Sequence, residues 1–222
     1  MNRLKLLLSS GIGRKMLMAF TGLALIGFLV THLSANMLIL FSKEAFNEYG
    51  HALTSNPLIY IAEFGLLAIF VGHFITGFIV ERGNRKARPI AYEEANGAGG
   101  PSSKSLASST MILTGIVLLI FVPLHIWTFK FGAWYVVEGH EHVRDLHRLV
   151  IEIFQSPAYV IAYVAALALM GYHAWHGFGS AFESLGASHS KAFRRFGNLF
   201  AVVLAGGFII IPIVIILGGG AQ

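Results

Sequence analysis

The sequence predicts an all-α integral membrane protein, a bundle of five transmembrane helices that forms a single domain over residues 1–222. Composition is the first reason: hydrophobic residues make up 55% of the chain and charged residues 12%, whereas a soluble domain carries about 25% charged residues. The second reason is that the apolar residues gather in five long, nearly charge-free stretches. About 20 apolar residues cross a hydrocarbon core of roughly 30 Å, so each stretch is long enough to span a membrane.

In chain order, the predicted spans cover residues 16–41, 57–80, 105–129, 153–182 and 196–218. Glu63, in the second span, is the one Asp, Glu, Lys or Arg within them. Nothing alternates in polarity as a membrane β-strand would, and a helix satisfies its own backbone hydrogen bonds in lipid, so each span is expected to be helical. Residues 92–105 form a Gly/Ser-rich linker between the second and third spans. The loop over residues 130–152 is expected to contain a short interfacial helix.

Basic residues are concentrated on one side of this predicted topology. The N-terminal segment and the two loops on its side hold Arg3, Lys5, Arg14, Lys15, Arg82, Arg85, Lys86, Arg88, Lys104, Lys191, Arg194 and Arg195. The other side holds only Lys43, Lys130, Arg144 and Arg148. The positive-inside rule therefore predicts a cytoplasmic N-terminus. The basic residues are not interleaved with aromatic residues on a polar surface, so we expect no nucleic-acid partner.

Histidines lie at membrane depth in four of the five spans: His32, His73, His125, and the closely spaced His173 and His176. An ionisable group in lipid is costly and is a functional candidate by default. For any single histidine, an interhelical hydrogen bond is at least as good an explanation as ligation. One histidine on each of four helices favours ligation.

The depths of four of these histidines predict two pairs. His32 and His125 lie late in helices that run outward, and they form an outer pair. His73 and His173 lie seven and nine residues before the inner ends of helices that run inward, about 10 and 14 Å from that boundary, and they form an inner pair. Two facing imidazoles without a carboxylate are typical of axial haem ligation, whereas zinc requires three or four protein ligands. The chain has no Cys for thioether attachment, so two stacked bis-histidine b haems are predicted.

Small residues lie near two of the proposed ligands. Gly77 follows His73 by four residues, and Gly177 follows His173 by four residues. A flat macrocycle needs such space, although each glycine alone could simply permit close helix packing. His173 and His176 cannot both bind one haem, and the shared glycine offset favours His173. His176 is expected to hydrogen-bond to a neighbouring helix.

These segments resemble the cytochrome b membrane anchor of succinate:quinone oxidoreductases and quinol:fumarate reductases, the single-subunit, five-helix, two-haem (b558) type. The resemblance covers almost the entire chain. It rests on GRKMLMAFTGLALIGFLVTHLSAN around His32, GHFITGF around His73, MILTGIVLLIFVPLHIW containing His125, YHAWHGFGSAFESLG around His173, and DLHRLVIEIFQSPAYV before the fourth span.

The resemblance implies that His32, His125, His73 and His173 are the axial iron ligands of two haem b groups. It also implies a flavoprotein subunit and an iron–sulphur subunit on the cytoplasmic side, which hold the dicarboxylate site. This chain would then contribute no residue to dicarboxylate catalysis. It would relay electrons to or from a membrane quinone, usually menaquinone in this family, as a multi-pass subunit of a respiratory succinate dehydrogenase or fumarate reductase in the cytoplasmic membrane.

The family places one quinone site near the outer haem, with a carboxylate in the first outer loop, which here reads FSKEAFNEYGHALTSNP. Glu44 and Glu48 are both candidates, and Glu48 is preferred because it lies beside Tyr49 and closer to the second span. Each could equally be an ordinary solvated loop charge. Glu63, near the outer end of the second span, is separate: it could be protonated, contact a quinone or bond to a neighbouring helix.

Two other functions remain open at this point. A two-haem cytochrome b of another respiratory dehydrogenase, for hydrogen or formate, would share the haems and differ in its partners. A haem-free transporter could use the histidines as proton relays, and it would show no haem spectrum. A structural anchor without any cofactor does not account for histidines at two levels.

Overall fold

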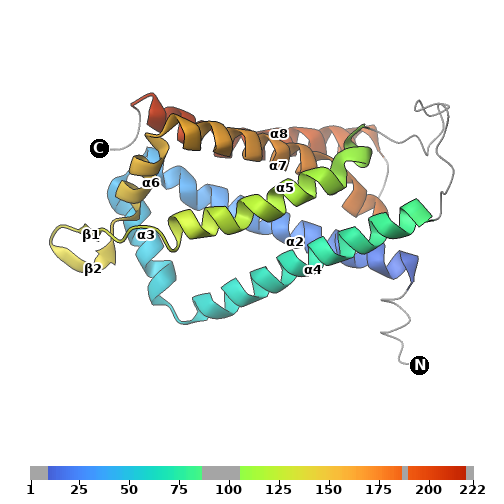
Figure 1. Cartoon of the computed structure of the whole chain (residues 1–222), viewed down its shortest axis with the longest axis horizontal. Coiled ribbons are helices and arrows are strands. Elements are labelled where there is room, and N and C mark those ends of the chain that lie inside the picture. The colour runs from blue at the N-terminus through green and yellow to red at the C-terminus, as the bar shows by residue number, and fades with distance from the viewer. Residues whose placement is uncertain (1–9, 87–105, 187–189, 219–222) are drawn as a thin grey trace.

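Five long helices lie side by side along the long axis of the molecule (Figure 1). The computed structural model describes residues 10–86, 106–186 and 190–218. The long helices are α2 (Gly11–Met37), α4 (Leu58–Lys86), α5 (Leu106–Phe129), α7 (Pro157–Ser184) and α8 (Lys191–Ile216). All five are long and apolar enough to cross a membrane, which confirms the predicted all-α membrane bundle.

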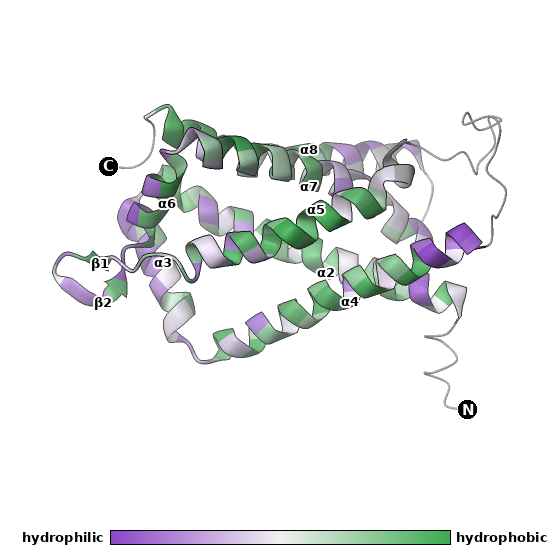
Figure 2. Ribbon diagram, viewed as in Figure 1, coloured by the Kyte–Doolittle hydropathy of each residue, from purple (hydrophilic) through white to green (hydrophobic). Residues whose placement is uncertain are grey.

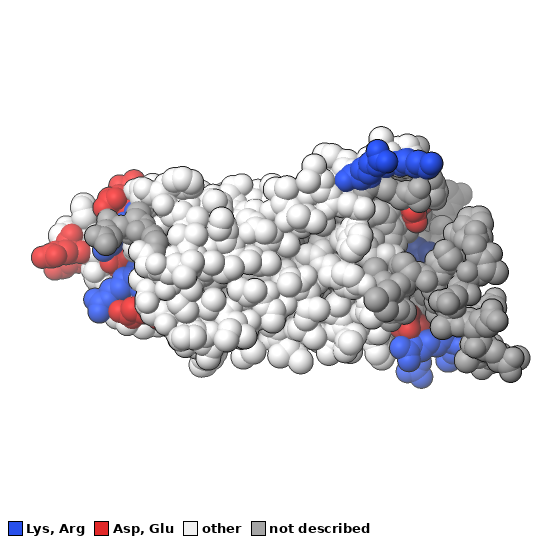
Figure 3. Space-filling model, turned by 90° about the horizontal axis from the view of Figure 1, so that it is seen from above, with Lys and Arg blue, Asp and Glu red and all other residues white. Residues whose placement is uncertain are grey.

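Charged side chains lie at the two ends of the bundle, and the surface between them is free of charge in the view of Figure 3. The helix surfaces in this middle belt are predominantly apolar (Figure 2). Large apolar side chains are exposed along it, including Phe64, Ile161 and Val202. Such a belt is unfavourable in water and favourable in lipid, so the chain is a multi-pass membrane protein.

The helices run past the charge-free stretches from which they were predicted. Helix α2 begins at Gly11, α4 continues to Lys86 and α8 begins at Lys191. Long basic side chains extend to the interface while their backbone stays helical, so charge marks the edge of the hydrocarbon better than the end of a helix. The fourth span differs at its start, because α7 begins at Pro157, where a missing N–H costs no hydrogen bond. The predicted linker lies outside the described residues.

Short elements cap the end of the bundle that carries His32 and His125. They are a 3₁₀ turn (Leu38–Leu40), α3 (Lys43–Ser55), the antiparallel hairpin β1 (Val136–Val137) and β2 (His140–Arg144), and α6 (Leu146–Phe154). Helix α3 replaces the loop expected there, and Ser42 caps it by accepting a hydrogen bond from Ala45 N at 3.1 Å. Helix α6 begins within residues 130–152, where a short helix was expected, and ends at Phe154, two residues into the predicted fourth span. The hairpin was not predicted.

A buried hydrogen-bond network joins α3 to α6 within this cap. Asp145 is 5% exposed and accepts hydrogen bonds from Asn47 Nδ2 at 2.9 Å and from Arg148 N at 3.0 Å. Lys43 Nζ lies 3.0 Å from Asp145 Oδ2, the second carboxylate oxygen. Asn47 Oδ1 in turn accepts a hydrogen bond from His147 N at 2.9 Å. Burial alone would raise the pKa of Asp145, but these hydrogen bonds and the Lys43 charge together lower it.

Replacing Asp145 by alanine is expected to lower the free energy of unfolding of the cap by about 2–3 kcal/mol, because the α6 N-cap is lost and the Asn47 amide loses its acceptor. Since folding lowers the pKa of Asp145, its contribution is present above the unfolded value of about 4 and is lost as the pH falls through the folded value. Hydrogen exchange of α3 and α6 measures both effects. Glu141→Ala, on the exposed hairpin, is the control, and wild-type exchange in Asp145→Ala would contradict the prediction.

Close packing of α7 against α8 forms one side of the bundle. A Cβ atom on Gly171 would lie 2.5 Å from Ala205 Cβ, so only glycine permits this approach of the two helices. Small residues at crossings are typical of membrane helices. Helix α4 lies at the edge of the bundle, where Thr76 is its only buried residue. The predicted ligands lie on four helices that pack around the middle of the molecule, α2, α4, α5 and α7.

Candidate functional site: two histidine pairs

The structure brings the four predicted ligands together in two pairs. The ring centroids of His32 and His125 are 5.8 Å apart, and those of His73 and His173 are 6.4 Å apart. A metal–imidazole bond of about 2 Å puts each centroid roughly 3 Å from the metal, so two rings on opposite sides of one metal lie about 6 Å apart. Both pairs fit this separation. In the described part of the chain, no three His, Asp or Glu side chains are arranged to share a metal ion.

Hydroxyl groups on neighbouring helices hold both rings of the inner pair. Thr21 Oγ1 on α2 lies 3.0 Å from His73 Nδ1, and Thr114 Oγ1 on α5 lies 2.9 Å from His173 Nδ1. Bonding at Nδ1 leaves Nε2 available for a metal. These threonines were not predicted. The signal that could have found them is spacing, since each precedes an outer-pair histidine by 11 residues, three helical turns on the same face.

The same spacing separates the two pairs in depth. Thr21 contacts the inner pair and His32 belongs to the outer pair, and 11 residues of α2 lie between them. At 1.5 Å per residue, the inner and outer pairs are about 16 Å apart along the helix axis. Two cofactors held by these pairs would be stacked across the membrane.

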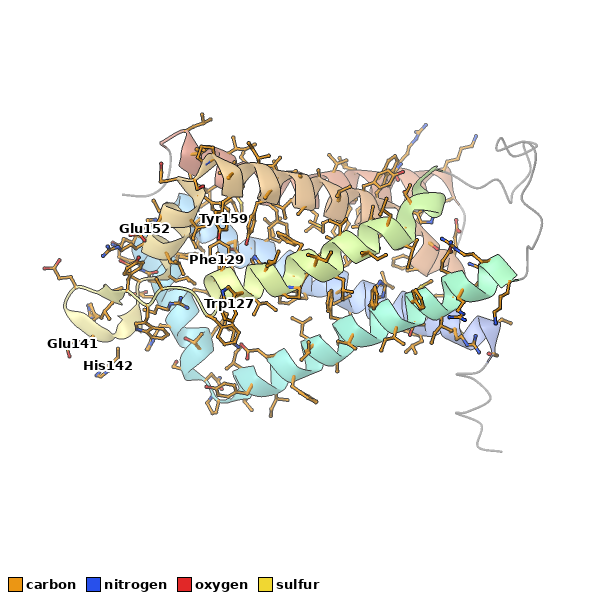
Figure 4. All side chains as sticks on the ribbon, viewed as in Figure 1. Trp127, Phe129, Glu141, His142, Glu152 and Tyr159 are labelled. Carbon is orange, nitrogen blue, oxygen red and sulfur yellow. The ribbon has the colours of Figure 1, made fainter. Side chains whose placement is uncertain are left out.

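Aromatic side chains surround the outer pair. Phe28 stacks on His32 at 5.2 Å between centroids, with an interplanar angle of 18°. The rings within 6.0 Å of either histidine also include Phe121, Phe129, Tyr163 and Phe208. Figure 4 labels Phe129, which is directed into the bundle, and Trp127, which is directed toward the α4 side. Tyr163 OH lies 3.4 Å from His125 Nδ1, so the outer pair has a longer and different polar contact from the inner pair.

The remaining histidine of α7 and the two glycines have ordinary surroundings. His176 is half-buried and belongs to neither pair, and its expected hydrogen bond to a neighbouring helix stays a prediction. A Cβ atom at Gly77 would lie 3.8 Å from Met18 Sδ, and one at Gly177 would lie 3.9 Å from Met111 Cε. Both glycines thus face a methionine of the neighbouring helix, and their role beside a cofactor stays a prediction.

The three candidate carboxylates lie in different surroundings. Glu44 and Glu48 are exposed on α3. Hydrogen bonds from its own backbone N–H and from the Ser42 hydroxyl lower the pKa of Glu44, which keeps it ionised. Glu63 instead lies on α4, where it forms an ion pair with Lys130 just beyond the end of α5. The ion pair bridges two helices that otherwise make few contacts.

An apolar, partly open hollow of about 320 Å³ lies beside Glu63. It is lined by Phe28, Ile59, Ala62, Glu63, Gly65, Leu66 and Ile69. Glu63 is its one ionisable lining residue, and Phe28 is the ring that stacks on His32. The hollow therefore connects a carboxylate to the outer histidine pair through a single side chain. Glu44 and Glu48 do not line it.

Comparison with known proteins agrees with this architecture. The chain is 24% identical over 179 residues to the succinate dehydrogenase cytochrome b558 subunit of Bacillus subtilis, covering 80% of this chain and 81% of the relative. It is 29% identical over 126 residues to the succinate dehydrogenase hydrophobic membrane anchor subunit of Halobacterium salinarum, covering 57% of this chain and 85% of the relative. No protein-family model and no solved structure matches the chain. The resemblance predicted from the sequence is confirmed: this chain is similar to the membrane-anchor and cytochrome b558 subunits of succinate dehydrogenases.

Proposed function

We propose that this chain is the di-haem cytochrome b subunit that anchors a succinate dehydrogenase, or a fumarate reductase, in the cytoplasmic membrane. It passes electrons between an iron–sulphur subunit and a membrane quinone. The observation that carries the proposal is the pairing of His32 with His125 and of His73 with His173, at two levels and each at the separation that one metal requires. The sequence similarity to two succinate dehydrogenase subunits supports the choice of complex.

The residues of each pair would hold one haem b between two helices. When bound, haem b supplies a reversible one-electron couple. The chain contributes one imidazole nitrogen from each of the two helices and fixes the orientation of both rings. The apolar side chains of the surrounding helices exclude water from the site. Two imidazole ligands on one haem iron would leave no position open for a small ligand such as carbon monoxide.

The distribution of basic residues supports docking of the catalytic subunits at the cytoplasmic end of the bundle. Among the described residues, the end of the bundle that includes the inner pair carries Arg14, Lys15, Arg82, Arg85, Lys86, Lys191 and Arg195. By the positive-inside rule this end and the N-terminus are cytoplasmic. The flavoprotein and iron–sulphur subunits, which hold the dicarboxylate, dock there. This chain is then the electron-relay and quinone subunit of the enzyme, and its inner pair, His73 and His173, lies nearer the docked subunits than its outer pair.

The quinone site in this proposal is the hollow beside Glu63, in preference to Glu44 or Glu48. An apolar recess suits the ring and isoprenoid tail of menaquinone, and Glu63, which pairs with Lys130, is the one ionisable residue that lines it and could exchange protons there. Phe28 lines this recess and stacks on His32, so the recess lies next to the outer histidine pair. Glu44 and Glu48 are exposed on α3 and do not line the hollow.

Succinate is expected to reduce b-type haem in membranes that contain the assembled complex, because the proposed relay starts at the iron–sulphur subunit. The measurement is the absorbance difference before and after succinate, followed by dithionite for full reduction. Membranes that contain this chain without its partners are the control, and there only dithionite should reduce the haem. Haem that stays oxidised with succinate but is reduced by hydrogen or formate would assign the chain to another dehydrogenase. A chain without haem would favour a transporter.

A further inference from the structure

Two helices of the bundle carry the same local pattern. Helix α2 reads Met18-Ala19-Phe20-Thr21-Gly22, and nine further residues precede His32. Helix α5 reads Met111-Ile112-Leu113-Thr114-Gly115, and nine further residues precede His125. The pattern Met-x-x-Thr-Gly-x₉-His therefore occurs once on each helix that supplies an outer ligand.

Each copy makes the same contacts with the helix that supplies an inner ligand. The threonine hydroxyl bonds Nδ1 of the inner histidine, as described above. The glycine lies beside the ring: a Cβ atom on Gly22 would be 3.1 Å from His73 Cε1, and one on Gly115 would be 3.7 Å from His173 Cε1. The methionine faces the glycine four residues after that histidine. Helices α2 and α4 thus repeat the arrangement of α5 and α7.

The threonine hydroxyls also bond their own helix, which fixes the direction of the bond to the imidazole. Thr21 Oγ1 donates to Leu17 O at 2.8 Å, with Met18 O at 3.1 Å as the alternative acceptor. Thr114 Oγ1 likewise donates to Met111 O at 3.0 Å. A hydroxyl has one proton, so with that proton on a backbone carbonyl its oxygen accepts from Nδ1–H. Each inner imidazole then carries its proton on Nδ1 and keeps the Nε2 lone pair for a metal.

We propose that Thr21–Gly22 and Thr114–Gly115 are two imidazole cradles, positioning residues that fix the rotamer, tautomer and electron donation of the inner ligands His73 and His173. This inference rests on the proposed haem function. A hydrogen bond accepted from the distal ring nitrogen raises the basicity of a ligating imidazole, which stabilises ferric iron and lowers the reduction potential. The outer ligands have no threonine–glycine cradle, and their ring nitrogens lie instead 3.4 Å from Tyr163 OH and 3.4 Å from Asn36 Nδ2, so each cradle acts on the inner haem.

Valine has the shape of threonine without the hydroxyl, so Thr21→Val and Thr114→Val remove the acceptor with little change in volume. In the purified complex, each variant is expected to shift the ferric–ferrous equilibrium of the inner haem about tenfold toward ferrous iron, which is roughly 60 mV upward in a redox titration. The outer haem should keep its potential and serves as the internal reference. Thr21→Ser and Thr114→Ser, which keep the hydroxyl, should keep the wild-type potentials. Ser184→Ala, which removes a hydroxyl that donates to Ser180 O within α7, is the matched control.

The two glycines provide a second test that does not depend on the threonine variants. Gly22→Ala should turn the His73 ring, because a Cβ atom at 3.1 Å is too close, whereas Gly115→Ala meets His173 at an ordinary 3.7 Å and should be nearly neutral. The anisotropy of the low-spin iron EPR signal depends on the angle between the two imidazole planes, so it should change for the inner haem in Gly22→Ala only. Wild-type inner-haem potential in both valine variants, or equal EPR spectra in the two alanine variants, would overturn the cradles while the haem function stands. A wild-type complex without inner haem would overturn the proposed function itself.

Discussion

Replacing either histidine of one pair by alanine is expected to remove one haem and to leave the other. His32→Ala or His125→Ala should lose the outer haem, and His73→Ala or His173→Ala should lose the inner haem. The pairs are about 16 Å apart along α2, so the ligands of one level do not contact those of the other. Loss of one axial imidazole removes half of the protein ligation of that iron. Loss of the inner haem should also reduce assembly with the cytoplasmic subunits that are proposed to dock at that end.

This prediction is tested by measuring the haem content per chain and by a redox titration of the purified variants. His176→Ala is the matched control, since it lies on the same helix as His173 but outside both pairs, and it should retain both haems. If His176→Ala loses a haem and His173→Ala does not, the ligand assignment on α7 is wrong. If one alanine variant removes both haems while the chain still inserts and folds, the two levels are not independent.

Glu63→Gln is expected to lower kcat/KM for quinone by about 10–100-fold and to leave the haem content and the reduction of haem by succinate unchanged. A carboxylate beside the reacting ring can exchange protons with quinone, and an amide of the same shape cannot. The change also breaks the ion pair between Glu63 and Lys130. Quinone reduction by the purified complex, at several quinone concentrations, gives the two kinetic constants.

The exposed carboxylates of α3 are the matched controls for this variant. Glu44→Gln and Glu48→Gln should change quinone turnover by less than about twofold, because neither residue lines the hollow and substitutions of solvated charges have small effects. The reverse result, with Glu48→Gln slow and Glu63→Gln normal, would move the quinone site to α3 and return it to the position first favoured from the sequence.

The long helices were predictable because length and charge alone decide whether a segment can cross a membrane. Their ends were less predictable, since Arg85 and Lys86 extend α4 beyond the charge-free stretch without entering the hydrocarbon. Helix α3 and the hairpin were missed for another reason. Contacts between distant parts of the chain stabilise such short elements, and the Asn47–Asp145 hydrogen bond that fixes this cap joins residues 98 positions apart. No local pattern reveals that partner.

The candidate site, like the fold, could be predicted only in part. The rise per residue of a helix is fixed, so position along the chain converts directly into depth, and depth was enough to pair His73 with His173. Contacts around each ring depend also on how the helices rotate about their axes and how far they tilt. The bond from Thr21 and the hollow beside Glu63 both arise from these rotations and tilts. The hollow in particular requires α4 to lie at the edge of the bundle, which hydropathy does not indicate.

Haem stoichiometry in the purified complex tests the central claim most directly. A reduced-minus-oxidised spectrum, with haem and protein quantified on the same sample, is expected to give two b-type haems per copy of this chain. Both should be low-spin and six-coordinate, and carbon monoxide should leave the reduced spectrum unchanged, because the proposed ligands His32/His125 and His73/His173 would leave no open coordination position on either iron. A ratio of one or zero haem per chain, or rapid carbon monoxide binding by the native protein, would contradict two bis-histidine sites.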